Sequence, residues 1–165
     1  MADDEGVEAG GEVIWGGTEI ARRNMACFQK HAAAERICDL DGTMDTVTRN
    51  APFQIVHGTG LVVRGWDEVR AFYKERFGTF TGRVLFPHRV IATDKYCVIE
   101  GWFKGSPKGM FFGAMSHGKP LFLPMCVWVY FEDELLKGEA VYLDGAELQR
   151  QIREGATGDP ATPLV

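Results

Sequence analysis

The spacing of hydrophobic residues divides the chain into a helical first part and a strand-rich second part. Apolar positions recur at helical spacing after Thr18, a residue type that can cap a helix N-terminus. The pattern predicts a helix over residues 18–38, a short second helix through Met44 and Val47, and a third helix whose apolar stripe runs from Val69 to Phe77 and ends at Gly78.

A period of two replaces the helical period beyond Gly78. It predicts strands at residues 84–91, 96–104, 121–131 and 135–143, with turns at 105–109 and 116–120. A short alternating strand is also predicted earlier, at residues 53–57, between the second and third helices. A final helix is expected near Asp144, with Glu147 as its capping-box partner. Helices followed by a long antiparallel meander predict an α+β protein whose helices pack on one face of the sheet.

The predicted strand at residues 121–131 is apolar on both faces. Leu123, Val127 and Val129 fall on one side, while Trp128 and Tyr130 fall on the other. An antiparallel sheet with one wet face would alternate apolar and polar residues, so both faces must be covered. We therefore expect a homodimer formed through the sheet, the alternative being that the aromatic residues fill a thick monomer core.

Length and composition are those of one globular domain. The chain has 165 residues, of which 45% are hydrophobic and 25% charged. Residues 1–12 are acidic and glycine-rich and residues 154–165 contain prolines and glycines, so a disordered arm and a loose tail are expected around a domain at residues 13–153.

Charge and cysteine usage bear on partners and location. The net charge of -5 and the scattered Lys and Arg residues argue against nucleic acid as a partner. The four cysteines stand far apart among apolar residues, which predicts buried thiols in a reducing compartment. No signal-peptide pattern and no apolar run approaching about 20 residues are found, so we expect a cytoplasmic protein that does not enter the membrane.

Several spaced motifs between residues 105 and 152 occur in a recognisable order. A glycine-rich turn and Gly118-Lys119-Pro120 precede the long apolar strand, which is followed by Phe131-Glu132-Asp133, by EAVYLD at residues 139–144 and by LQRQI at residues 148–152. Upstream, residues 63–73 read VRGWDEVRAFY. Together these motifs resemble the SnoaL-like polyketide cyclase family of the nuclear transport factor 2-like superfamily, from Thr18 to Ile152. One departure is Gln151-Ile152-Arg153, where the family usually ends in Gln-Leu-Gly.

The resemblance implies a cone-shaped fold, in which a curved sheet wraps around a helix and leaves a deep apolar pocket. Cyclases of this family use one acidic residue for proton transfer, with no metal or organic cofactor. The family motif maps that acid onto Asp144. The superfamily also contains isomerases, epoxide hydrolases, dehydratases and non-catalytic binding proteins, so the fold does not select among them.

Two carboxylates near the end of the last strand compete for the role of pocket acid. An acid in an apolar pocket has a raised pKa and can exchange protons with a carbon acid near neutral pH. Asp144 is the family-guided candidate, although Asp-x-x-Glu is also a structural capping box. Strand parity puts Glu139 on the face opposite to Tyr142 and Asp144, so both acids cannot enter one pocket unless a bulge intervenes. For Glu139 the alternative is a solvated charge paired with Lys137.

Other polar and aromatic residues have both functional and structural interpretations. His57 ends the first strand and could face the pocket as a base or hydrogen-bond donor, or be a packed structural histidine. Glu100 belongs either at a pocket mouth or in a cross-strand ion pair. The histidine spacings match no metal motif, so no metal is expected. Candidate pocket-wall residues, which could equally be core, are His88, Tyr73, Trp102, Phe111, Phe112, Trp128 and Tyr142.

The leading hypothesis is a cofactor-independent enzyme that performs aldol cyclisation or isomerisation on a hydrophobic carbonyl compound. In it Asp144 is the acid/base, His57 polarises or orients the substrate, and Tyr142 and Trp128 line the pocket. The alternative is a non-catalytic protein that uses the same pocket to hold a small apolar ligand or a partner. A pocket without a buried carboxylate would favour this alternative.

Overall fold

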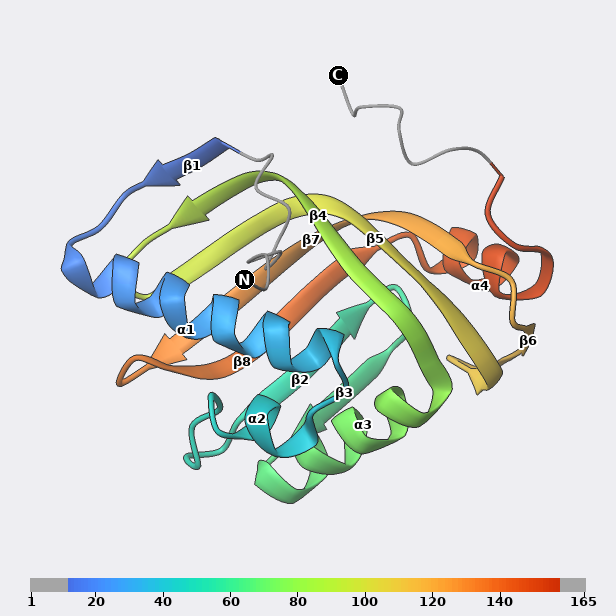
Figure 1. Ribbon diagram of the computed structural model, residues 1–165, viewed down its shortest axis with the longest axis horizontal. Helices are drawn as coiled ribbons and strands as arrows, with labels where there is room; N and C mark the ends of the chain where they lie inside the picture. Colours follow the sequence, from blue (N-terminus) through green and yellow to red (C-terminus); the bar gives the residue numbers. More distant parts are fainter. Residues whose placement is uncertain (1–11, 158–165) are drawn as a thin grey trace, which may run out of the picture.

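The computed structural model describes residues 12–157, which form a curved mixed sheet with helices on its concave side (Figure 1). The eight strands follow the order β1-β4-β5-β7-β8-β2-β3, and β6 pairs with β5. The strands are β1 (Glu12–Trp15), β2 (Phe53–His57), β3 (Leu61–Arg64), β4 (Phe80–Ala92), β5 (Tyr96–Phe111), β6 (Ala114–His117), β7 (Leu121–Glu132) and β8 (Leu135–Leu143). The helices are α1 (Glu19–Arg36), α2 (Leu40–Met44), α3 (Trp66–Thr79) and α4 (Gly145–Glu154). The expected α+β cone is confirmed.

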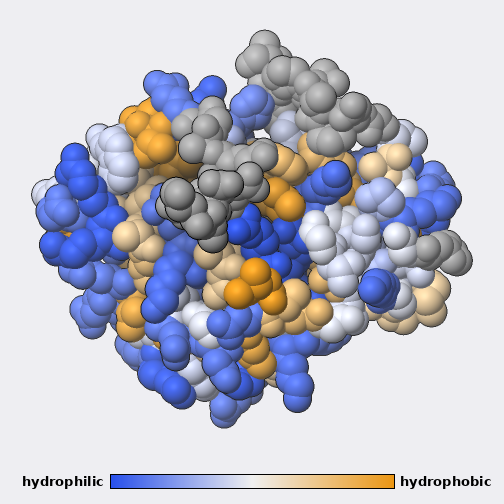
Figure 2. All heavy atoms as spheres, in the orientation of Figure 1, coloured by the Kyte–Doolittle hydropathy of each residue, from blue (hydrophilic) through white to orange (hydrophobic). Residues whose placement is uncertain are grey.

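Helix α1 is tied to the sheet at its N-cap residue, Thr18. The Thr18 hydroxyl accepts a hydrogen bond from the Ile20 N–H, and Asp94, in the turn between β4 and β5, accepts from the Thr18 N–H at 2.7 Å. The helix buries Met25, Phe28 and other residues of one stripe against the sheet. Its outward side is polar, and Figure 2 shows a mainly hydrophilic surface on this side of the molecule, with hydrophobic residues in separate places. Burial of one helical stripe therefore fixes α1 across the concave face.

The long strands bend where their pairing slips. The register of β4 against β5 shifts between Thr81 and Val84 and again between Pro87 and Arg89, and such bulges increase the local bend and twist of a sheet. Near the first shift, the Phe80 ring lies over Gly105, where any Cβ would collide with it. The bend separates a second hydrophobic cluster from the main core. This second cluster includes residues of α4 and consists of Phe80, Phe111, Ala114, Leu121, Leu123, Leu148 and Ile152.

Three short strands and two parallel pairings were not predicted. β1 pairs in parallel with β4 and β2 in parallel with β8, so the sheet is mixed rather than wholly antiparallel. The turn expected at 105–109 is wrong, because β5 continues to Phe111 by pairing with both β4 and β6. The hairpin turns instead at Phe112 and Gly113, whose φ angles of 42° and 77° suit a tight two-residue turn. Pairing with distant strands therefore keeps residues 105–109 extended, although their glycines are typical of a turn.

The ends of the chain can be compared only in part with the predicted boundaries. Most of the predicted arm lies outside the described residues, although Glu12 already belongs to β1. At the other end, Gly155 and Ala156 donate backbone hydrogen bonds to Gln151 and Pro120, and residues 158–165 lie outside the described range. No helix in the described part of the chain is both long and apolar enough to cross a bilayer.

The convex face of the sheet carries partly exposed aromatic side chains. Val127 and Val129 of β7 are buried on the concave side, whereas Trp128 and Tyr130 alternate with them on the other face. The Trp128 ring centroid lies 5.1 Å from that of Tyr96 and 6.3 Å from that of Tyr130. The helices α1 and α3 pack on the opposite face, so this aromatic surface is not part of the core that they close.

Candidate functional site

Polar side chains from four separate elements meet inside the cone. His31 of α1, Gln54 of β2, Tyr73 of α3 and Glu139 of β8 are 1%, 2%, 0% and 8% exposed. Each sits on the inward face of its element, among the apolar residues of the main core. We call these residues the polar cluster. Burying so many polar groups is unfavourable unless they bond to one another.

The hydrogen bonds of the polar cluster run in one direction. The Thr46 hydroxyl donates to the Thr43 carbonyl at 2.6 Å, so it must accept from His31 Nδ1, which lies 2.6 Å away. With its proton on Nδ1, neutral His31 accepts at Nε2 from the Tyr73 hydroxyl, at 3.1 Å. The Tyr73 oxygen in turn accepts from Gln54 Nε2 at 2.6 Å. These bonds together assign the Nδ1-protonated tautomer to neutral His31 and set the orientation of the Gln54 amide.

Glu139 ends this chain of bonds. Its Oε2 accepts from Gln54 Nε2 at 3.1 Å, and the Tyr73 hydroxyl lies 3.5 Å away. The parallel pairing of β2 with β8 sets Gln54 directly beside Glu139. Burial raises the pKa of the Glu139 carboxyl, and the negative charge of Glu35 adds to the rise, whereas His31 opposes it only in its protonated form. A carboxyl group with a raised pKa is suited to taking up and returning protons near neutral pH.

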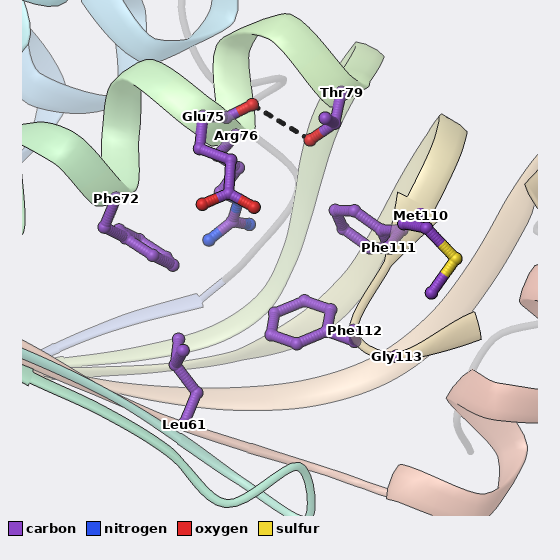
Figure 3. Close-up of a pocket in the computed structure, with 9 residues that line it drawn as sticks. All are labelled: Leu61, Phe72, Glu75, Arg76, Thr79, Met110, Phe111, Phe112 and Gly113. Carbon is purple, nitrogen blue, oxygen red and sulfur yellow. Dashed lines mark hydrogen bonds between the residues drawn. The ribbon is translucent and has the colours of Figure 1, made fainter. Parts of the chain in front are cut away.

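A cavity of about 250 Å³ opens beside the polar cluster, between α3, β3 and the β5–β6 hairpin (Figure 3). It is lined by Leu61, Phe72, Glu75, Arg76, Thr79, Met110, Phe111, Phe112 and Gly113. Tyr73 and Arg76 lie one helical turn apart on α3. The positive charge of Arg76 partly opposes the rise in the pKa of Glu139 that burial causes. Arg76 thus connects the cavity with the polar cluster, whose own four residues do not line it.

Two polar atoms in this region are buried without a hydrogen bond in the described part of the chain. They are Nε of Arg76 and Oε1 of Gln54. Burial lowers the pKa of Arg76, because the charged guanidinium has lost its water. Buried donors and acceptors are paired in most native proteins, so these two atoms are where a bound molecule could form bonds that the free protein lacks.

The structure places Asp144, His57 and Tyr142 outside the cavity lining. Asp144 is exposed, and its Oδ1 accepts from the N–H groups of Ala146 and Glu147 at 2.9 and 3.0 Å, so it caps α4. The Glu147 N–H makes the first bond of the capping box, to Asp144. The second bond is replaced, because the Glu147 carboxylate pairs with Arg150 instead. His57 is exposed and stacks on Tyr142 at a centroid distance of 4.2 Å. These residues lie away from the cavity because the strand parity that turns Gln54 and Glu139 inward turns His57 and Tyr142 outward.

The other candidate residues divide between the cavity, the polar cluster and the convex face. Phe111 and Phe112 line the cavity, and Tyr73 belongs to the polar cluster. Trp102 does not line the cavity but stacks on Phe122 at 4.5 Å, and Trp128 lies in the convex aromatic surface. His88 is the extra residue of the second bulge in β4. These last positions depend on how the strands pair, which local sequence does not reveal.

The ion-pair alternatives for the two strand glutamates have opposite outcomes. Glu100 pairs across the sheet with Arg89 at 3.2 Å, as one of its two interpretations predicted. Lys137 does not pair with Glu139, because its ammonium group lies 3.2 Å from Glu132. Glu139 is therefore a buried carboxyl group bonded to an amide, and not a solvated surface charge.

Sequence reasoning did not identify His31, Gln54 or Arg76 as site residues. Each carried a usable signal: His31 lies on the apolar stripe of its predicted helix, Gln54 on one face of its strand, and Arg76 three residues after Tyr73. Polar residues at core positions indicate either a paired network or a site. Among the described residues, no group of three or more His, Cys, Asp or Glu side chains could hold a metal ion.

Comparisons with known proteins agree with this architecture. A family model described as the SnoaL-like domain matches residues 22–138. No curated protein matches the sequence. Among solved structures, the chain is similar to a provisionally named SnoaL-like polyketide cyclase from Jannaschia sp., with a TM-score of 0.71 and 17% identity over 86% of this chain and 97% of that chain.

Two further solved structures share the fold. A nuclear transport factor 2-like protein of unknown function from Burkholderia pseudomallei has a TM-score of 0.64 and 20% identity, over 79% of this chain and 97% of that one. A protein with a ketosteroid isomerase-like fold from Catenulispora acidiphila, solved with trimethylamine, has a TM-score of 0.62 and 13% identity, over 80% and 97% of the chains. At such identities these likenesses establish the fold alone.

Proposed function

This chain belongs to the SnoaL-like domain family, and from that premise we propose that it is a cofactor-independent enzyme acting on a hydrophobic carbonyl compound. Glu139 is the proposed acid/base, replacing Asp144 in the role that the family resemblance suggested. The observation that carries the proposal is the buried Glu139 carboxyl group, which is bonded to Gln54 beside an apolar cavity. The family includes proteins named as polyketide cyclases, which fits this class of substrate.

The proposed chemistry begins with removal of a proton. The ionised Glu139 carboxylate takes a proton from the carbon next to the substrate carbonyl, which leaves an enolate and a neutral carboxyl group. In an isomerisation, Glu139 returns that proton to a different carbon of the same molecule. In an aldol cyclisation, the enolate carbon bonds to a second carbonyl carbon, and the alkoxide formed there takes the proton. Either route returns Glu139 to its starting state.

The surroundings of Glu139 suit this role. Its raised pKa makes the carboxylate a stronger base than one in water. The difference in pKa between Glu139 and a weakly acidic C–H group is therefore smaller. Gln54 and Tyr73 are positioning residues, because they hold the carboxyl group within a fixed chain of bonds. Since Glu139 does not line the cavity, the proposal requires that a bound substrate displace side chains at the inner end of the cavity.

Proton exchange in a model ketone tests the proposal without knowledge of the natural substrate. The probe is 2-tetralone in D₂O, with loss of its α-proton signals followed by NMR and corrected for buffer-catalysed exchange. Wild-type protein should accelerate exchange, and Glu139→Gln should reduce the acceleration at least about a hundredfold, a usual contribution of a general base. Retention of the wild-type rate by Glu139→Gln would exclude Glu139 as the base.

Asp144→Asn is the matched control. Asn caps helices as well as Asp does, so the variant should keep both its stability and its exchange activity. Loss of activity in this variant alone would return the catalytic role to Asp144. If wild-type protein binds the ketone but does not accelerate exchange, the chain is a binding protein. This second candidate function is favoured by one observation: the residues of the polar cluster do not line the cavity.

We also propose that a second copy of the chain covers the convex face and that the protein works in the cytoplasm. The partly exposed rings of Tyr96, Trp128 and Tyr130 lie next to one another on that face, which supports a self-complementary contact. All four cysteines are free thiols, as is usual in a reducing compartment.

A further inference from the structure

The cavity combines apolar walls with one half-buried basic residue, whose Nε atom is buried. Most of its lining consists of the side chains of Leu61, Phe72, Met110, Phe111 and Phe112. Arg76 is the basic residue among the lining residues. In Figure 3 its side chain extends from α3 toward the space between Phe72 and Phe112. A cavity of this composition favours ligands with an apolar body and one anionic group.

The guanidinium of Arg76 has an unused donor. Its Nε is buried and has no hydrogen-bond partner in the described part of the chain. The guanidinium carbon lies 5.5 Å from the centroid of Phe72 and 5.7 Å from that of Phe103, so the planar group is held between aromatic rings. An unpaired buried donor is costly, and a carboxylate that accepted from it would form a charge-assisted bond of the stronger kind.

The acidic residues around Arg76 leave this donor available. Glu35 and Glu139 act on Arg76 through space, without a hydrogen bond to its Nε. Glu75 lines the cavity but is exposed, so water and salt screen its repulsion of an anionic ligand. The Thr79 hydroxyl is already used, because it donates to the Glu75 carbonyl at 3.0 Å. Arg76 is thus the group in this lining that can bind an anion away from water.

The size of the cavity limits the apolar part of the ligand. An engineered protein cavity of about 150 Å³ accommodates benzene. The volume of about 250 Å³ found here is larger by roughly one further ring. A bicyclic body is therefore the size that fills the space without displacing the backbone.

We infer that the cavity takes a bicyclic-sized apolar molecule carrying a carboxylate, which accepts a hydrogen bond from Arg76 Nε. This rests on the proposed function for the identity of the site, and it narrows the substrate class from hydrophobic carbonyl compounds to carboxylic acids among them. Arg76 is the specificity-determining residue. It fixes the carboxylate end of the ligand, so that the apolar remainder lies along the aromatic and aliphatic walls of the cavity.

The test compares two probes that differ in charge but hardly in shape. 2-Naphthoate and 2-naphthamide are titrated into the full-length protein by calorimetry at neutral pH. Wild-type protein should bind naphthoate at least about tenfold more tightly, the preference expected from one charge-assisted hydrogen bond. Equal affinity for the two probes, or no binding of either, would overturn the inference, and this comparison needs no variant.

Variants on the same helix assign the preference to its source. Arg76→Gln should remove the preference for naphthoate. Arg70→Gln should keep it, because Arg70 lies outside the cavity lining and pairs with Asp41 at 2.7 Å. Glu75→Gln should keep or increase it. Preference retained in a folded Arg76→Gln protein would overturn the assignment to Arg76.

The binding test and the exchange test fail independently. If Glu139→Gln still exchanges 2-tetralone at the wild-type rate while naphthoate is bound through Arg76, the proposed chemistry is wrong and the anion site stands. If exchange depends on Glu139 but the two naphthalene probes bind equally, the proposed function stands and the carboxylate preference is wrong.

Discussion

The side chain of Gln151 hydrogen-bonds to both backbone groups of Phe122. Its Oε1 accepts from the Phe122 N–H at 2.6 Å, and its Nε2 donates to the Phe122 carbonyl at 2.9 Å. β8 pairs with β7 only from Met125 onward, so this glutamine takes the place of a neighbouring strand for the start of β7. Leu148 and Ile152 add apolar contacts beside it. Helix α4 is thereby docked onto the sheet by specific bonds as well as by burial.

Replacing Gln151 with Ala should destabilise the protein by about 2–4 kcal/mol, because two buried backbone groups lose their partners. Urea denaturation followed by circular dichroism measures the change. Arg153→Ala is the control on the same helix; its side chain is exposed, and its loss should change stability by less than about 0.5 kcal/mol. Equal effects of the two variants would show that α4 is held by hydrophobic contact alone.

Glu139→Gln should be more stable than the wild type at neutral pH. Burial raises the pKa of Glu139 above its unfolded-state value, so the stability that its neutral form provides is present at low pH and is lost as pH rises through the folded-state pKa. The difference between the proteins should be near zero at about pH 4 and grow by about 1.4 kcal/mol for each unit of pKa shift. Denaturation at a series of pH values measures it, and a gap that did not vary with pH would refute the prediction.

Glu147→Gln should show the opposite dependence on pH. Hydrogen bonds from Arg150 and Gln151 lower the pKa of Glu147 to about 2. Its contribution is therefore present above the unfolded-state pKa and lost as pH falls through about 2. Because this carboxylate is partly exposed, the effect at neutral pH should be small and should weaken with added salt. The same pH series measures both variants, and effects of equal sign would contradict the assignments.

Tyr73→Phe should cost about 1–3 kcal/mol of stability, since it leaves His31 Nε2 without a donor and a Gln54 N–H without an acceptor. Tyr142→Phe is the control, an exposed tyrosine whose loss should change little. Nitrogen NMR of the imidazole ring provides a second measurement. Wild-type His31 should be the tautomer protonated at Nδ1, and detection of a proton on Nε2 alone would reverse the inferred direction of the bonds.

Trp128→Glu should convert the proposed dimer into a monomer, because it places a charge in the aromatic surface of the convex face. Sedimentation or light scattering measures the mass. The control is Ile37→Glu, a change of an exposed apolar residue beyond the end of α1 that should leave the mass unchanged. A wild-type protein that is monomeric at concentrations of about 100 μM would rule out this interface as a stable one.

Local pattern was sufficient for the main elements but not for the site. The strand β2 and the boundaries of β8 were predicted closely, because alternation and turn residues act over a few positions. Parity correctly separated Glu139 from Asp144, yet which face is interior depends on the parallel pairing of β2 with β8, for which no local signal exists. Arg76 was missed for a different reason: arginine is usually a surface residue, and only the packing of α3 shows that its Nε is buried beside the cavity.

Gln54 and Glu139 bond to each other across 85 positions of sequence. Closing a contact of such long range costs more chain entropy than closing a local one, and such contacts slow folding. During synthesis, His31, Gln54 and Tyr73 leave the ribosome well before β8 exists, so the growing chain must hold their polar groups in water or in temporary pairs. The polar cluster therefore also reports complete folding: it can form only after β8 has been synthesised and has paired with β2.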